Sequence, residues 1–220
     1  MTVTIYGVYR SRASRNYWMA EEIGLPVVSV PVIQAYRLPD CHAPGAPLNT
    51  RSPAFLAISP AGAIPVMTDG DLVLTESLAI NLHLARTYGG DLGPRNPAED
   101  ALMQAAALHA ATAIEPWSLA ILFAFAEGRA DTAEGQAVVT DCTRKLARPL
   151  ARLEEHFARN AFLVGGRFTA ADLNLAEILR YAQGHPDLLP SHPALDRWLR
   201  TCQDRPAFRS MWERRNAEPA

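Results

Sequence analysis

Apolar residues recur with two different periods along the first part of the chain. Residues 2–6 alternate, with Val3 and Ile5 on one face, and this period of two predicts a half-buried strand. Residues 12–23 carry an apolar stripe at helical spacing, and residues 27–32 form a second apolar run of strand length. A strand, a helix and a strand with a crossover of this length predict a parallel pair with a right-handed connection.

A hairpin and a further helix follow. Residues 52–57 can form a short helix, and residues 64–68 and 72–74 are two short apolar runs. The Asp-Gly pair at 69–70, between these runs, is typical of a tight hairpin turn. A helical pattern begins at residues 75–77. The order β-α-β-α-β-β-α therefore describes a small α/β domain.

The second part of the chain has only helical periodicity. Residues 89–95 are rich in glycine and break all periodicity, as a domain linker does. Residues 96–99, Asn-Pro-Ala-Glu, form a complete helix start. Residues 168–173 combine a capping-box spacing, Thr169 and Asp172, with a hydrophobic staple. The expected division is residues 1–88 for the α/β domain, 89–95 for the linker and 96–220 for an all-helical domain.

Two features of the hairpin and the following helix predict a binding site. Pro65 cannot donate to a sheet ladder, so we expect it at a sheet edge, with a cis bond after Ile64. Ser77 lies where the helix leaves its first N–H groups unpaired, which suits a carboxylate ligand. The neighbouring Glu76 suits an ammonium group on the same ligand. An open edge beside a pocket for an α-amino acid head predicts a site for a small peptide.

Composition and charge narrow the class of partner. The chain has 220 residues, 49% hydrophobic and 20% charged, and its formal charge of −2 does not attract nucleic acid or anionic membrane. Cys41, Cys142 and Cys202 are too far apart for a zinc motif or a disulfide framework. Residues 117–126 are too few to cross about 30 Å of bilayer, and residues 1–6 lack a signal-peptide order. We therefore expect a soluble cytoplasmic protein without a metal, a nucleic-acid partner or a membrane partner.

Together these motifs resemble those of the cytosolic glutathione transferases, of bacterial type with a serine-type active site. The family's Asn-Pro-x-Gly-x-x-Pro-Val-Leu appears here as residues 59–67, and its Glu-Ser pair as residues 76–77. The staple and capping box at residues 168–173 also match. The resemblance implies a thioredoxin-like, glutathione-binding N-terminal domain and an all-helical C-terminal domain that contributes a hydrophobic substrate pocket. It also implies a homodimer with a role in detoxification.

The resemblance further implies which residues bind glutathione. They are Thr50, Arg51, Ile64, Pro65, Glu76 and Ser77. The first pair falls where relatives contact the glycyl carboxylate, the second where they hold the cysteinyl backbone, and the third where they hold the γ-glutamyl group. Two positions depart from the family pattern, because Thr50 replaces a frequent His and Ala63 replaces a frequent Lys, Arg or Gln. The second departure removes one contact with glutathione.

Catalysis in this family needs a hydrogen-bond donor that stabilises the thiolate of glutathione. A free thiol has a pKa near 8.5, and each unit of decrease corresponds to about 1.4 kcal/mol. One hydrogen bond to a charged group, roughly 1.5–3 kcal/mol, is therefore the right size. Ser11 lies four residues before Arg15, the spacing of serine-type members, and the helix N-terminus adds positive potential. Tyr6 is the alternative donor, as in tyrosine-type members, and Tyr9 and Ser14 are further possibilities.

The second substrate is less well defined by sequence. Met103, Ala106 and His109 occupy the region that faces the active site in relatives, and their small average size indicates a roomy pocket. We expect a glutathione transferase whose thiolate attacks electrophilic, hydrophobic small molecules. The alternatives are a glutathione-dependent isomerase, dehalogenase or peroxidase, and a non-catalytic glutathione- or ligand-binding protein of the same fold.

Overall fold

The computed structural model describes residues 2–219, which form two compact units. The first unit contains the chain up to Gly90 and again from Pro206 onward, and the second is Asp91–Arg205. The last segment joins the first unit because α9 (Pro206–Ala217) packs along α1 (Ser14–Glu22). The observed grouping therefore differs from the expected helical domain of 96–220 at its end.

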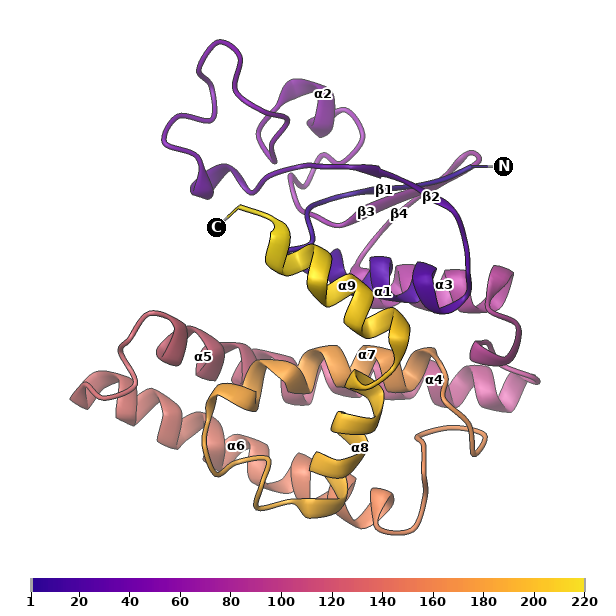
Figure 1. The fold of residues 1–220 in the computed structure, drawn as a ribbon, viewed down its shortest axis with the longest axis vertical. Helices are drawn as coiled ribbons and strands as arrows, with labels where there is room; N and C mark the ends of the chain where they lie inside the picture. The colour runs from indigo at the N-terminus through magenta and orange to yellow at the C-terminus, as the bar shows by residue number, and fades with distance from the viewer. Residues whose placement is uncertain (1, 220) are drawn as a thin grey trace. The chain divides into compact units, whose positions relative to one another are not determined.

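A four-stranded sheet in the order β2-β1-β3-β4 forms the centre of the first unit (Figure 1). β1 (Val3–Tyr6) pairs in parallel with β2 (Val27–Val30), as the strand–helix–strand pattern predicts. β3 (Val66–Asp69) pairs antiparallel with both β1 and β4 (Leu72–Thr75). The predicted parallel pair and the predicted hairpin are thus both confirmed.

Helices cover both faces of this sheet. Figure 1 shows α1 beside α3 (Ser77–Tyr88) on one face, and α2 (Pro53–Leu56) on the other, after the short η1 (Ala35–Arg37). A small core lies on the α2 side, where Tyr6 and Ile64 pack against it. We call this cluster the α2-side core; its buried members are Val32, Phe55 and Val66. Since side chains alternate along a strand, the buried Val3 and Ile5 of β1 face the opposite side.

Pro65 does not lie on an edge strand, so that expectation is wrong. β3 has a hydrogen-bonded neighbour on each side, and the edge strands are β2 and β4. The strand begins at Val66, one residue after the proline. Pro65 therefore precedes the hydrogen-bonded part of β3, so its missing N–H leaves no gap in the sheet ladder. The Ile64–Pro65 peptide bond is cis, as expected.

The second unit is built from helices alone. Its central helix is α7 (Ala170–Leu179), in which every residue is buried, as the apolar residues all round its axis predict. The predicted capping box at its start is present. The helices of this unit after the short η2 (Gly90–Leu92) are α4 (Pro97–His109), η3 (Ala110–Ile114), α5 (Glu115–Ala126), α6 (Ala133–Phe157), α7 (Ala170–Leu179), η4 (Arg180–Gly184) and α8 (Pro193–Gln203).

The helical run that begins at Pro97 continues beyond α4. A π-helical turn, η3, joins α4 to α5, so the chain remains helical through Pro116. The resulting run Pro97–Ala126 is long and apolar enough to cross a membrane by length and composition alone. In this unit α4 packs against α7 and α5 packs against α6, so both halves of the run have helical partners within the unit.

Candidate functional site

The predicted thiolate donor, Ser11, lies in the turn between β1 and α1. Its Oγ donates a hydrogen bond to the carbonyl of Val8 at 2.6 Å and accepts one from the N–H of Ala13 at 3.0 Å. The side chain is half-buried. A serine hydroxyl carries a single proton, so donation to a sulfur atom requires that this proton turn away from Val8. The acceptor contact with Ala13 can persist while the hydroxyl turns.

The alternative donors are held in different surroundings. The ring of Tyr6 packs against the α2-side core. Tyr9 stacks on Tyr17 at 4.1 Å between ring centroids, and its hydroxyl accepts a hydrogen bond from Arg214 at 3.2 Å. Ser14 is fully buried in α1. Ser11 is only half-buried and lies three residues before the first residue of α1, where the helix dipole favours negative charge.

Ile64 lies beside the beginning of the same turn. Gly7 has a φ of +151°, and a Cβ added to it would lie 2.8 Å from the Cβ of Ala13 and 3.6 Å from that of Ile64. A side chain at position 7 would therefore collide with the first turn of α1. Glycine at this position allows the turn that carries Ser11 and the residue before the cis-proline to approach closely.

Glu76 holds an unusual backbone conformation immediately before α3. Its φ is +67° and its ψ is 107°, and within residues 2–219 it is the one non-glycine residue with a positive φ. Such a conformation costs on the order of 1–3 kcal/mol and is found preferentially at ligand sites. The carbonyl of Glu76 accepts the N–H of Ile80 at 2.9 Å, while its side chain is exposed. The strained residue thus presents its carboxylate to solvent at the start of α3.

A buried polar network fixes Ser77, and sequence reasoning did not assign it. The guanidinium of Arg15, with 1% exposure, donates to the Ser77 hydroxyl at 3.0 Å. The amide of Asn16 donates to the Ser77 carbonyl at 2.9 Å and to Asn81 at 2.7 Å. The available signal was a pair of adjacent polar residues on a helix whose other inward positions are apolar. This network locks the start of α3 to α1 and brings a positive charge to Ser77.

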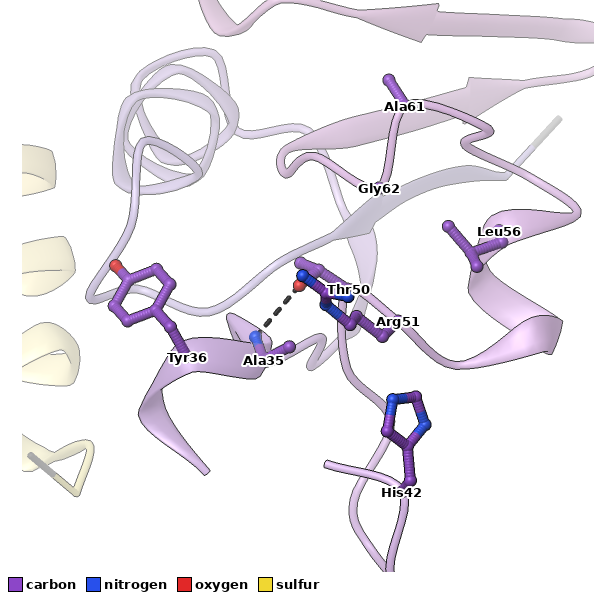
Figure 2. A pocket seen from close by; sticks show the side chains of 8 residues that line it. All are labelled: Ala35, Tyr36, His42, Thr50, Arg51, Leu56, Ala61 and Gly62. Atoms are coloured by element: carbon purple, nitrogen blue, oxygen red, sulfur yellow. Dashed lines mark hydrogen bonds between the residues drawn. The ribbon is translucent and has the colours of Figure 1, made fainter. Parts of the chain in front are cut away.

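Thr50 and Arg51 border a pocket of about 470 Å³ (Figure 2). Thr50 Oγ1 accepts the N–H of Ala35 at 3.0 Å, which ties the pocket to η1. A Cβ added to Gly62, whose φ is +60°, would lie 2.9 Å from the Thr50 carbonyl, so this turn requires glycine. Figure 2 shows Arg51 and His42 on the side of the pocket away from Gly62. The residues that line it are Ala35, Tyr36, His42, Thr50, Arg51, Leu56, Ala61 and Gly62.

These contacts connect the predicted glutathione-binding residues through one side of the first unit. The turn at Gly62 approaches Thr50, the side chain of Ile64 approaches Gly7, and α1 contacts Ser77 through Arg15. Positions scattered over the sequence are therefore neighbours in the fold. The groups in this series can pair with a carboxylate, an ammonium group and an extended peptide.

The predicted residues of the second-substrate pocket lie on α4 in the second unit. Met103 is fully buried, whereas Ala106 and His109 keep part of their surface. The role of these residues stays a prediction. Among residues 2–219 no group of three or more His, Cys, Asp and Glu side chains is arranged to hold a metal ion.

Family models match most of the sequence. The model of the glutathione S-transferase N-terminal domain matches residues 5–94, and that of the C-terminal domain matches residues 105–206. Glutathione S-transferase 3 of Zea mays is 34% identical over 167 residues, which are 72% of this chain and 74% of the relative. Glutathione S-transferase 3 of Schizosaccharomyces pombe is 26% identical over 224 residues, covering 94% and 85% of the two chains.

Solved structures agree with the sequence comparison. Glutathione transferase F7 from Populus trichocarpa has a TM-score of 0.81 at 26% identity, covering 98% of this chain and 100% of its own. The theta class glutathione S-transferase from Xanthomonas axonopodis pv. citri, solved with glutathione bound, has a TM-score of 0.75 at 28% identity, covering 95% and 96%. A thioredoxin-like domain followed by a helical domain is their shared architecture. The chain belongs to the glutathione S-transferase family.

Proposed function

We propose that this glutathione transferase uses Ser11 to stabilise the glutathione thiolate for attack on electrophilic, hydrophobic small molecules. The observation that carries the proposal is a series of contacts: the Gly62 turn approaches Thr50, Ile64 approaches Gly7 at the start of the turn that carries Ser11, and Arg15 of α1 bonds Ser77. A tripeptide with an ammonium group, two carboxylates and a thiol has a partner of matching charge at each end of this series.

The proposed binding mode follows the polarity of glutathione. The α-amino group pairs with the exposed Glu76 carboxylate, and the α-carboxylate pairs with the N–H groups at the start of α3 and with the hydroxyl of Ser77. The cysteinyl backbone pairs with Ile64, next to the cis-proline Pro65. The glycyl carboxylate faces Thr50 and the Arg51 guanidinium, at the pocket of about 470 Å³.

In the proposed reaction the Ser11 hydroxyl turns from the Val8 carbonyl to the glutathione sulfur. The thiol proton passes to solvent, and the hydrogen bond together with the N-terminus of α1 stabilises the resulting thiolate. The sulfur then forms a bond to an electrophilic carbon of the second substrate. In a substitution the leaving group departs with its bonding electron pair, so charge and atoms balance.

A pair of hydroxyl deletions tests this assignment. Loss of one hydrogen bond to a charged sulfur, about 1.5–3 kcal/mol, corresponds to about a 10- to 100-fold decrease in kcat/KM. We expect this decrease in Ser11→Ala with an activated aryl chloride, together with a higher pKa of the bound thiol by about one to two units. Glutathione affinity should change little. Tyr6→Phe is the matched control, and a large loss there with an active Ser11→Ala would transfer the role to Tyr6.

We also propose that the protein works as a homodimer in the cytoplasm. Leu102 and Leu108 on α4 are 57% and 67% exposed, which supports an apolar contact between copies. Cys41, Cys142 and Cys202 form no disulfide bond with one another, which fits a reducing compartment. Sedimentation at micromolar concentration tests the dimer, and a monomer of the single-chain mass would refute it.

A further inference from the structure

The segment after α9 reaches back to the turn that carries Ser11. One carboxylate oxygen of Glu218 accepts the backbone N–H of Tyr9 at 2.7 Å, and the other accepts that of Arg10 at 2.8 Å. These are the two residues directly before Ser11. Hydrogen bonds to a charged acceptor are about twice as strong as neutral ones, and a bidentate pair also fixes orientation. A residue more than 200 positions away, at a separation of 209 from Tyr9, thus holds the turn.

The end of α9 contacts the same turn from other directions. The guanidinium of Arg215 donates to the Tyr9 carbonyl at 2.8 Å, and the Arg10 side chain donates to the Arg215 carbonyl at 3.2 Å. Arg214 donates to the Tyr9 hydroxyl at 3.2 Å. The carbonyl and the side chain of Tyr9 are therefore bonded to the end of α9, and its N–H to Glu218 directly after α9, which leaves the backbone at this point little freedom to shift.

The holding segment is itself anchored to α1. The rings of Trp18 and Phe208 meet edge to face at 4.9 Å between centroids, and Met211 on α9 is fully buried. Glu218 continues the helical hydrogen bonding, since its N–H donates to the Arg214 carbonyl at 3.2 Å. α9 thus connects the turn rigidly to the helix whose N-terminus follows Ser11.

We propose that Glu218 is a positioning residue for the thiolate donor, an inference that rests on the proposed function of Ser11. By fixing the N–H groups of Tyr9 and Arg10, its carboxylate sets the position from which the Ser11 hydroxyl reaches the sulfur. A misplacement of about 1 Å in a catalytic group can cost about 100-fold in rate. Both carboxylate oxygens of Glu218 are bonded to the backbone of the turn, so its effect passes through the turn.

Charge and position make opposite predictions for the loss of Glu218. A nearby carboxylate disfavours a thiolate, so if Glu218 acted through its charge, removal would lower the pKa of the bound thiol. If Glu218 acts by position, removal displaces the donor and raises that pKa. The sign of the pKa shift therefore separates positioning from a purely electrostatic effect.

The test compares Glu218→Ala and Glu218→Gln with Glu213→Ala. Glu213 is exposed on α9, so its loss removes the same charge from the helix without removing a contact to the turn. We expect Glu218→Ala to lower kcat at least about tenfold with a smaller change in KM, and to raise the thiol pKa in the pH profile of kcat/KM. Glu218→Gln, which keeps one acceptor oxygen, should lie between wild type and Glu218→Ala.

Hydrogen–deuterium exchange gives a readout that does not depend on turnover. The amides of Tyr9 and Arg10 should exchange faster in Glu218→Ala than in the wild type. In Glu213→Ala their exchange rates should equal those of the wild type. An active wild type whose kcat, pH profile and exchange are unaltered by Glu218→Ala would overturn the positioning role alone. A lowered pKa of the bound thiol in Glu218→Ala would also overturn the positioning role. A wild type without glutathione turnover would overturn the proposed function, and with it this role, even if the exchange of the two amides responds.

Discussion

Asp172 is the side chain whose loss should destabilise the second unit most clearly. It is fully buried at the start of α7 and its carboxylate accepts hydrogen bonds from four donors. One oxygen accepts the N–H and the hydroxyl of Thr169, each at 3.0 Å. The other accepts the N–H of Leu163 at 2.9 Å and the indole N–H of Trp198 at 3.2 Å. The carboxylate therefore joins the preceding loop, α7 and α8.

The expected cost of Asp172→Ala follows from the donors that it leaves behind. The Thr169 hydroxyl can rotate to another acceptor, but three N–H groups lose their partner inside the protein. A buried donor without a partner costs about 1–3 kcal/mol, and neighbouring losses are less than additive. We therefore expect the free energy of unfolding to fall by about 3–5 kcal/mol, a large part of the 5–15 kcal/mol typical of a protein.

Urea unfolding followed by circular dichroism measures this change. The matched control is Thr132→Ala at the start of α6, where the exposed Thr132 hydroxyl accepts the N–H of Gly135 at 3.1 Å and donates to the Arg129 carbonyl at 2.8 Å. An exposed cap of this kind should cost about 1 kcal/mol. Equal losses in the two variants would refute the reasoning, because the buried network would then add nothing to an ordinary helix cap.

Two further predictions concern charge. The Arg167 guanidinium, which meets the Glu99 carboxylate at 2.7 and 3.1 Å, acts together with the backbone N–H of Arg95 at 2.9 Å to lower the pKa of Glu99 from 4.5 to about 2. This lowered pKa contributes stability that is present above about pH 4.5 and is lost as the pH falls toward 2. Across that pH range the midpoint of thermal unfolding should depend less steeply on pH in Arg167→Ala than in the wild type, whereas Arg95→Ala should retain most of the dependence. Identical curves for Arg167→Ala and the wild type would contradict this prediction. In Arg51→Ala, steady-state kinetics should show a KM for glutathione raised several-fold at nearly constant kcat, since uniform binding is lost; a fall in kcat alone would argue against a carboxylate-binding role.

Local signals in the sequence were sufficient for the elements that they describe. The capping box at Thr169 and Asp172 predicts the start of α7, and the Asp-Gly pair at 69–70 predicts the hairpin, because each depends on residues within a few positions. The expectation that Pro65 lies at a sheet edge was wrong because the place of β3 in the sheet depends on its pairing with β1, about 60 residues earlier by sequence number. No local pattern around Pro65 reports that partner.

The packing of the last helix, α9, likewise depends on a distant partner that no local pattern reports. Arg205-Pro206 follows the end of α8 at Gln203, and Pro206 is also the first residue of α9. Proline is favoured at that position, since its missing N–H would be unpaired anyway. The return of α9 to α1 depends on Trp18 and Phe208 meeting across most of the chain. That contact leaves no periodic signal in either segment.

In the candidate site, the proposed ligand-binding residues can be predicted from the sequence, whereas the residues that support them cannot. Glu76 and Ser77 are recognisable because a peptide ligand requires particular groups at a helix start, and such groups follow one another in sequence. Arg15 and Glu218 act on those elements from elsewhere, through a 3.0 Å contact to the Ser77 hydroxyl and a bidentate contact to the turn before Ser11. Their geometry is set by helix packing, so it becomes visible only in the fold. Substitutions at such supporting positions should therefore alter rate and thiol pKa while leaving every ligand-binding motif intact.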